Sequence, residues 1–300
     1  MVIDLGGDRN RVSRSRSNSA GRGTMQASSG RWLVSALLCA SVLLGISPLF
    51  AAELIVDVGS KKTLTTEELL ARPDVTTIQV PDDPAYHRAK TYRAVPLRAL
   101  LGADGLPADQ ALQVTGTDGY VTNLPSNLVS AEGKAAVPWV AIEPPGQPWQ
   151  KTPDGAAIGP FYLVWLDPAA SGVTSEQWPY MLASIHAVPV NATKWPQIMV
   201  GNEVPADSPI RTGQNFFAAQ CMACHRLNGG GDATLGPDLN IPHNPTEYWQ
   251  PWALKALIRN PGSVRIWPEM KMHGFDASVL KDGDIDTVIA YLGYMAAHRH

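Results

Sequence analysis

The stretch that decides the fold of the C-terminal part is Cys221-Met222-Ala223-Cys224-His225. Two cysteines three positions apart, with a histidine directly after them, form the spacing required for covalent attachment of a c-type haem. On a helical turn both thiols can reach the vinyl groups of one haem, and His225 lies on the face of Cys221, beneath the iron. The spacing predicts one covalent haem c, attached at Cys221 and Cys224, with His225 as an axial iron ligand.

The same cysteine spacing also occurs in zinc sites and in thioredoxin-like redox pairs. A zinc site would need a second pair of ligands at similar spacing, and a redox pair is typical of a βαβ unit. No cysteine follows residue 224, which favours the haem interpretation. His87, His186 and His243 have no partner at metal-ligand spacing and are interpreted as surface or packed residues.

The N-terminal 52 residues have the pattern of a leader and signal peptide. An apolar run, Leu33–Ile46, follows Arg31 and precedes the small residues Ala51 and Ala52. The run is shorter than the about 20 apolar residues that span a bilayer. We therefore expect cleavage near residue 52 and a mature protein in the periplasm, with membrane attachment only if the segment stays uncleaved.

Loss of this leader changes the charge of the chain. It removes six of the 24 basic residues and two of the 27 acidic residues, which leaves 18 and 25. An acidic protein excludes nucleic acid as a partner and suits redox proteins that present a basic docking face. Cys39 leaves with the leader, so no disulfide is expected.

The remaining chain is long enough for two cores, and its composition changes near residue 205. We predict an α+β domain at residues 53–200, a proline-containing linker at 201–209, and an all-α domain at 210–300.

Residues 53–200 contain short β-rich runs and many turn residues. Thr65-Thr66-Glu67-Glu68 predicts a capped helix start, and Asp118-Gly119 predicts a hairpin turn. Asp82 and Asp83 are interpreted as solvated turn charges. The expected strands are Leu54–Val58, Thr76–Val80, Ala111–Thr115, Tyr120–Leu124, Trp139–Ile142, Phe161–Trp165 and Met181–Val190.

Three helices are expected after residue 210. One spans 213–220 and ends at the cysteines, and one spans 249–259 and stops at Asn260-Pro261. The last is amphipathic, because four apolar residues recur at helical spacing. These are Ile285, Val288, Ile289 and Leu292.

Residues 210–297 resemble a class I cytochrome c domain. The shared features appear in the family's order: a glycine and an aromatic residue before Cys-x-x-Cys-His, a Gly236-Pro237 pair, a middle helix ending in Asn-Pro, a methionine loop and a terminal helix with Tyr291-Leu292. The resemblance implies that the carbonyl of Pro237 accepts the N–H of the His225 ring. Such a contact fixes the ring and aims its other nitrogen at iron.

The second axial ligand is expected in the loop Glu269–Phe275. The family commonly has Met-Pro-x-Phe there, and Met272 aligns with that methionine, although His273 replaces the proline. A thioether favours ferrous iron and suits an electron carrier, whereas a histidine ligand would lower the potential. Met272 is therefore preferred, and Met270, His273 and an open site remain as alternatives.

Residues 53–200 resemble the molybdopterin-binding domain of the sulfite oxidase family. The resemblance rests on the stretches Tyr92–Leu101, Gly116–Tyr120 and Gly159–Phe161. The family's molybdenum-ligating cysteine should follow the strand at Thr76–Val80, where this chain has Pro81. Without the thiolate the metal loses its protein ligand, so we expect no molybdopterin and a domain kept for docking or scaffolding.

Together these resemblances imply a periplasmic mono-haem cytochrome that passes electrons between redox partners, such as a dehydrogenase, an oxidase or another cytochrome. This describes an electron-transfer protein rather than an enzyme with its own substrate. The alternative is a molybdopterin-dependent oxidoreductase, similar to sulfite dehydrogenase, fused to its own cytochrome. A haem-based sensor is a third hypothesis.

Overall fold

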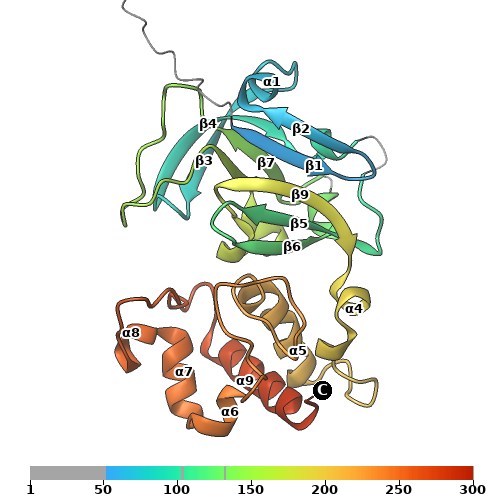
Figure 1. Ribbon diagram of the computed structural model, residues 1–300, viewed down its shortest axis with the longest axis vertical. Coiled ribbons are helices and arrows are strands. Elements are labelled where there is room, and N and C mark those ends of the chain that lie inside the picture. The colour runs from blue at the N-terminus through green and yellow to red at the C-terminus, as the bar shows by residue number, and fades with distance from the viewer. Residues whose placement is uncertain (1–51, 103–104, 132, 300) are drawn as a thin grey trace, which may run out of the picture. The chain divides into compact units, whose positions relative to one another are not determined.

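The computed structural model describes residues 52–102, 105–131 and 133–299, which lie within one compact unit, Leu49–His300. The predicted leader and signal peptide, apart from Ala52, fall outside these residues. Strands β1 to β9 and short helices come first and longer helices follow, so the expected order of an α+β region before a helical region is confirmed (Figure 1). We call residues 53–189 the sheet part and residues 191–299 the helical part.

Two sheets make up the sheet part. The first has the order β2 (Lys61–Thr65), β1 (Glu53–Asp57), β9 (Leu182–Pro189), β5 (Gln110–Gly116) and β6 (Val121–Pro125). The second has the order β3 (Thr76–Asp83), β4 (Arg88–Pro96), β7 (Val137–Ile142) and β8 (Phe161–Leu166). Neighbouring strands are antiparallel except β1 and β9, which pair in parallel. The predicted strands are all present, and β2 and β4 are additional.

Local signals explain two boundaries of the sheet part. Thr65 and Glu68 cap each other at the start of α1 (Thr66–Leu70), as predicted. Between β5 and β6, the amide of Gly116 donates to the carbonyl of Tyr120 at 2.8 Å, and Gly119 has a φ of 87°. The predicted turn at Asp118-Gly119 is therefore confirmed. It places β6 beside β5, at the edge of the first sheet.

One apolar core contains side chains from both sheets. Tyr92, Phe161, Tyr162 and Trp165 are its largest fully buried members. Short helical segments connect the strands around it. They are α2 (Leu97–Leu101), α3 (Ser126–Val129), η1 (Pro168–Ser171) and η2 (Ser175–Gln177).

Asp83 is a correction to the sequence interpretation, because it is fully buried rather than solvated. Its carboxylate accepts hydrogen bonds from the Tyr92 hydroxyl at 2.7 Å, the Tyr162 hydroxyl at 3.4 Å and the Ala85 amide at 2.9 Å. Burial raises the pKa of Asp83, and the hydrogen bonds oppose this shift. Tyr92 comes from β4, which pairs with β3, and Tyr162 comes from β8, so packing of these strands removes the carboxyl group from water.

The helical part confirms the three predicted helices. Its segments are α4 (Asn191–Lys194), η3 (Pro196–Ile198), α5 (Pro209–Phe216), the π-helical turn η4 (Phe217–Cys221), α6 (Pro245–Tyr248), α7 (Pro251–Arg259), α8 (Pro261–Val264) and α9 (Asp282–Ala297). Ile198 and Val200 pack with its core, while the domain limits proposed above stay a prediction. In the described part of the chain, none of the helices combines the length and apolar character needed to cross a bilayer.

Helices α5 and α9 cross at Gly213. A Cβ atom at this position would lie 1.9 Å from the carbonyl oxygen of Thr287 and 2.9 Å from the Cβ of Tyr291. Only a glycine allows the two backbones to approach this closely. One turn further, the rings of Phe217 and Tyr291 pack with their centroids 5.4 Å apart. The crossing thereby fixes the position of η4, which ends at Cys221.

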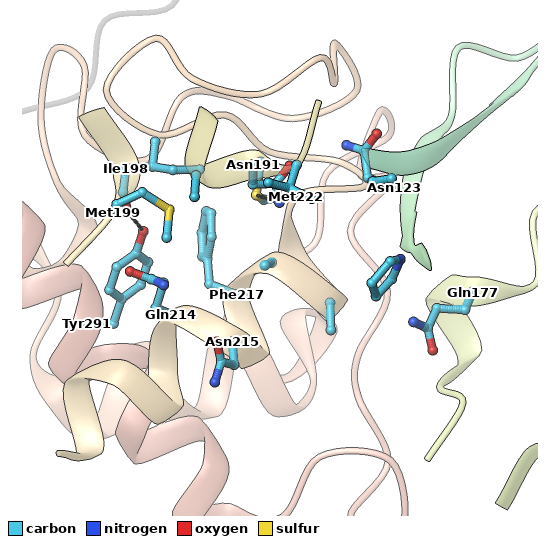
Figure 2. Close-up of a pocket in the computed structure, with 16 residues that line it drawn as sticks. Asn123, Gln177, Asn191, Ile198, Met199, Gln214, Asn215, Phe217, Met222 and Tyr291 are labelled. Carbon is cyan, nitrogen blue, oxygen red and sulfur yellow. Dashed lines mark hydrogen bonds between the residues drawn. The ribbon is translucent and has the colours of Figure 1, made fainter. Parts of the chain in front are cut away.

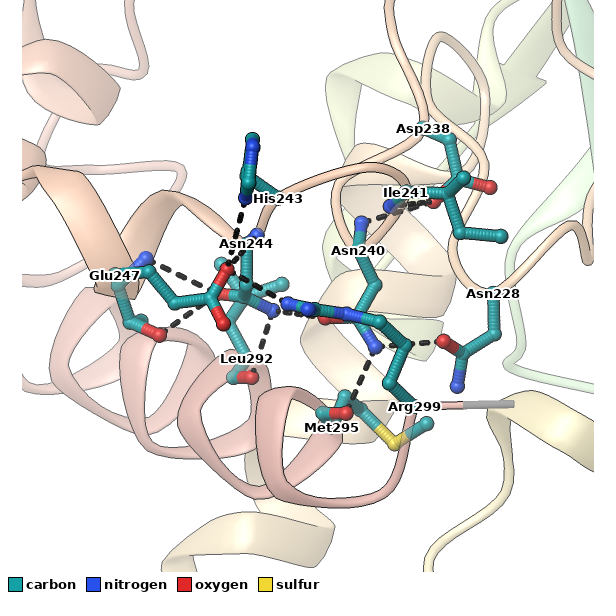
Figure 3. Close-up of polar contacts among 11 residues, drawn as sticks. Asn228, Asp238, Asn240, Ile241, His243, Asn244, Glu247, Leu292, Met295 and Arg299 are labelled. Atoms are coloured by element: carbon teal, nitrogen blue, oxygen red, sulfur yellow. Dashed lines mark hydrogen bonds and ion pairs between the residues drawn. The ribbon is translucent and has the colours of Figure 1, made fainter.

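Three buried asparagines bind the last turns of α9 (Figure 3). The side-chain amide of Asn240 donates to the carbonyl of Met295 at 2.7 Å and to Asn228 at 2.6 Å. The amide of Asn244 donates to the carbonyl of Leu292 at 2.9 Å and to Asn240 at 2.8 Å. These contacts tie the loop after the Cys-x-x-Cys-His motif to the terminal helix.

Candidate haem site

The Cys-x-x-Cys-His motif forms one helical turn at the end of η4. The amides of Cys224 and His225 both donate to the carbonyl of Cys221, at 3.1 Å and 2.8 Å. Cys221 and Cys224 are free and half-buried. The fold therefore holds the two thiols and the imidazole within one helical turn, at positions 221, 224 and 225, as covalent attachment of a single haem requires.

Both thiols lie in a desolvated, negatively charged environment. Burial raises the pKa of Cys221 to about 12 and that of Cys224 to about 11, and the charge of Glu176 adds to both shifts. Thiols with such high pKa values are protonated at neutral pH, so they are poor thiolate nucleophiles and poor cation ligands. This environment fits thiols that end as thioethers rather than a redox pair.

The imidazole of His225 is held in a fixed orientation. Its Nδ1 donates to the carbonyl oxygen of Pro237 at 2.9 Å, which is the contact implied by the cytochrome resemblance. Gly236 lies directly against the ring, since a Cβ there would be 2.5 Å from its Cε1. Burial lowers the pKa of His225, which favours the neutral ring. Nε2 is therefore the nitrogen available to a metal.

The loop that contains both candidate methionines packs against α7. Met272 is half-buried and contacts an apolar cluster that includes Leu254, Phe275 and Ile285. The carbonyl of Phe275 accepts a hydrogen bond from the guanidinium of Arg259. Met270 is half-buried but is not part of this cluster. The structure thus gives Met272 the defined packing, while its role as an iron ligand stays a prediction.

Glu176 is a residue of this site that the sequence analysis missed. It lies in η2 of the sheet part and is only 5% exposed. Its carboxylate accepts a hydrogen bond from the Tyr120 hydroxyl at 2.9 Å, and lies 3.0 Å from Nε2 of His273. The contact with Glu176 raises the pKa of His273. No local sequence pattern links residues 176 and 273. The local signal near Glu176 is the Thr174–Gln177 capping box, which indicates a short ordered segment there.

The sheet part also contacts the loop that follows the cysteines. Asp232 accepts hydrogen bonds from the Gln113 amide of β5 at 2.8 Å and from Lys194 of α4 at 2.7 Å. In the same loop, the amide of Gly229 donates to Asp238 at 2.7 Å. The loop after the cysteines is therefore held both by its own contacts and by residues of the sheet part and α4.

An apolar pocket of about 380 Å³ lies behind the attachment turn (Figure 2). Its lining includes Phe217, Met222 and Asn191, whose side-chain amide lies 3.6 Å from the Met222 sulfur, together with Met199 and Tyr291. The two cysteines, His225 and Met272 are not among its lining residues, so the pocket is distinct from the haem site. His186 and His243 lie outside the site: His186 is 3.9 Å from Asp57, and His243 is 3.9 Å from Glu247.

The side chains of the site fit a haem c. Two protonated thiols on one turn can form thioethers, and a neutral imidazole with a fixed ring can bind iron through Nε2. A thioether at Met272 would complete a ligand set without a vacant position for a substrate. The side chain of Gln220, which directly precedes Cys221, is only 2% exposed. Its amide nitrogen and oxygen have no hydrogen-bond partner within the described part of the protein.

Comparison with known proteins supports the assignment of the helical part. Residues 210–296 match the family model described as Cytochrome c. No curated protein matches the chain. No family match supports the sulfite oxidase-like resemblance of residues 53–200, which stays a prediction. Residues 210–296 are thus similar to a cytochrome c domain, and this similarity supports covalent haem c and a role in electron transfer.

Proposed function

We propose that this protein is a periplasmic cytochrome with one haem c that transfers electrons between redox partners, and that its sheet part serves as a docking or scaffold module. The carrying observation is the geometry around His225. Its Nδ1 donates to the Pro237 carbonyl at 2.9 Å, and His225 lies on the same turn as the two half-buried cysteines, within the segment that matches Cytochrome c. When bound, haem c supplies a one-electron couple of ferric and ferrous iron.

The chain's own residues perform three tasks in this function. Cys221 and Cys224 tether the macrocycle, His225 is presented to iron as a neutral ring, and Met272 provides a thioether from the opposite loop. Because both axial positions would be filled, the iron would not bind a substrate, which favours electron transfer over peroxidase or oxygen-activating chemistry. A ligand-saturated site also disfavours the sensor hypothesis.

The buried Asp83 supports a scaffold role for the sheet part. It lies at the end of β3, in the region where the sulfite oxidase family has its metal-ligating cysteine. Two residues after Pro81, the Asp83 carboxylate is satisfied by two tyrosine hydroxyls and a backbone amide. A pterin-bound metal would find no thiolate at this point.

The haem assignment is checked on protein matured in cells competent for cytochrome c biogenesis. Cys221→Ala and Cys224→Ala should each leave at most one thioether, which shifts the pyridine haemochrome spectrum. Metal analysis should give one iron per chain without molybdenum or pterin. Colourless wild-type protein with free thiols would refute the proposal, and stoichiometric molybdenum would favour the fused oxidoreductase.

The axial ligand is checked with a matched pair of variants. Met272→Ala should abolish the weak sulfur-to-iron absorption band at the red end of the ferric spectrum. Met270→Ala should leave it unchanged, because Met270 lies outside the apolar cluster that holds Met272. Loss of the band only in Met270→Ala would exchange the two assignments.

A further inference from the structure

Glu176 is the point at which the sheet part meets the methionine loop. The side chain is 5% exposed, so its carboxylate has little access to water. Its partners within the described residues include the Tyr120 hydroxyl at 2.9 Å, the Ser175 hydroxyl at 3.3 Å and Nε2 of His273 at 3.0 Å. A buried carboxylate is stable only when such partners replace water.

This contact restrains the methionine loop on a side that does not face α7, against which the loop also packs. Residues 265–281 contain no helix or strand. On one side, Arg259 of α7 holds the carbonyl of Phe275. On the other side, His273 reaches Glu176, and it directly follows Met272 in the chain. Because His273 is adjacent to Met272, the hydrogen bond between the His273 ring and the Glu176 carboxylate limits the positions that the Met272 sulfur can sample.

The same carboxylate lies close to the haem attachment turn. The segments η2 and η4 pack against each other, and η4 ends at Cys221. The charge of Glu176 also contributes to the raised pKa values of both cysteines. Glu176 is therefore within electrostatic range of both cysteines that would be attached to haem, and it contacts the loop that contains Met272.

We propose that Glu176 is a positioning residue for the haem iron: its hydrogen bond to His273 holds Met272 in place, and its negative charge stabilises the ferric state. This inference rests on the proposed function. The hydrogen bond lowers the access of competing ligands to the sixth position. The carboxylate lowers the reduction potential, because ferric iron has one more positive charge than ferrous iron. The sheet part thus sets properties of the cytochrome that it contacts.

Two substitutions separate the two effects. Glu176→Gln removes the charge but keeps an oxygen that can accept from His273, and Tyr120 retains its bond to the backbone carbonyl of residue 176 at 2.7 Å. At a fixed solution potential, the ratio of ferrous to ferric protein should rise about three- to tenfold, because a unit negative charge no longer stabilises the ferric iron. This magnitude assumes an effective dielectric constant of about 20 between the charge and the iron. The sulfur-to-iron band should persist.

Glu176→Ala removes the charge and the hydrogen bond together. Like Glu176→Gln, it should raise the reduction potential. It should also increase the affinity of the ferric protein for added imidazole by about tenfold, because the loss of one charge-assisted hydrogen bond makes Met272 easier to displace. His273→Ala breaks the same bond from the other side and should increase imidazole affinity while leaving the charge of Glu176 in place. This third variant decides the positioning role if Glu176→Ala does not fold.

Asp232→Asn is the matched control. It weakens another contact of the sheet part, with Gln113, but does not touch the methionine loop. Imidazole affinity should stay at the wild-type value. Equal increases in Asp232→Asn and Glu176→Ala would overturn the positioning role, because general loosening would explain both, and an unchanged potential in Glu176→Gln would overturn the electrostatic role.

The outcomes also distinguish this inference from the proposed function. If wild-type protein binds no haem, both fail. If it binds haem and shows the sulfur-to-iron band, but the Glu176 variants match the wild type in potential and imidazole affinity, only this inference fails.

Discussion

Gly213 is the residue at which the smallest substitution should produce the clearest loss of stability. In Gly213→Ala the new Cβ would lie 1.9 Å from the carbonyl oxygen of Thr287 and 2.5 Å from its carbonyl carbon. These are backbone atoms of α9, so no side-chain rotation can relieve the clash. The new methyl group and the Thr287 carbonyl must separate by about 1.5 Å before the contact becomes an ordinary one.

The magnitude follows from two opposing effects. Overpacking of a tight interface costs about 1–3 kcal/mol, and the backbone clash places this site at the upper end. Replacing a helical glycine by alanine returns about 1 kcal/mol of helix propensity. We expect a net loss of about 2 kcal/mol in the free energy of unfolding. The packing of Phe217 on Tyr291 should loosen as well, because it lies one turn away.

Gly293→Ala is the matched control on the opposite helix. Gly293 lies within α9, and a methyl group added to it would meet no other side chain or neighbouring element within 4 Å, so the alanine should stabilise the helix by about 0.5–1 kcal/mol. Both variants are measured by urea unfolding of the haem-loaded protein, followed by haem absorbance. If Gly213→Ala is as stable as the wild type, the close crossing of α5 and α9 is wrong.

Two further predictions concern buried polar groups. Asn240→Ala should lower the free energy of unfolding by about 1–3 kcal/mol, because it removes the buried hydrogen bonds of the Asn240 side chain with Asn228, Asn244 and the Met295 carbonyl. An unchanged urea midpoint would contradict the network of Figure 3. Burial raises the pKa of Asp83 in the folded protein above the pKa of about 3.9 that an aspartate has in the unfolded chain. The stability that the protonated form contributes is therefore complete below the unfolded-state pKa and is lost as pH rises through the folded-state pKa. The stability of Asp83→Asn relative to the wild type should therefore increase with pH in this window, and a difference that is constant with pH would show that Asp83 is not desolvated.

Much of the helical part could be predicted because its signals are local. The spacing of Ile285, Val288, Ile289 and Leu292 predicted α9, and all four lie on its inner face or beside it, buried or half-buried. The Asn260-Pro261 pair ended α7 as expected. In the sheet part, β2 and β4 were missed. Strand β2 is largely exposed, and β4 carries charged residues among its apolar ones although it occupies an inner position in its sheet.

The sequence by itself determined the local chemistry: a turn with two thiols and an imidazole, a capping box, a hairpin and a periodic helix. Each depends on residues within a few positions, whose geometry the backbone dictates. Only the tertiary structure decided that Asp83 is buried beneath Tyr92 and Tyr162, and that Glu176 meets His273 across 97 positions of chain. Desolvation and long-range hydrogen bonds depend on which elements pack together, and no local pattern encodes that.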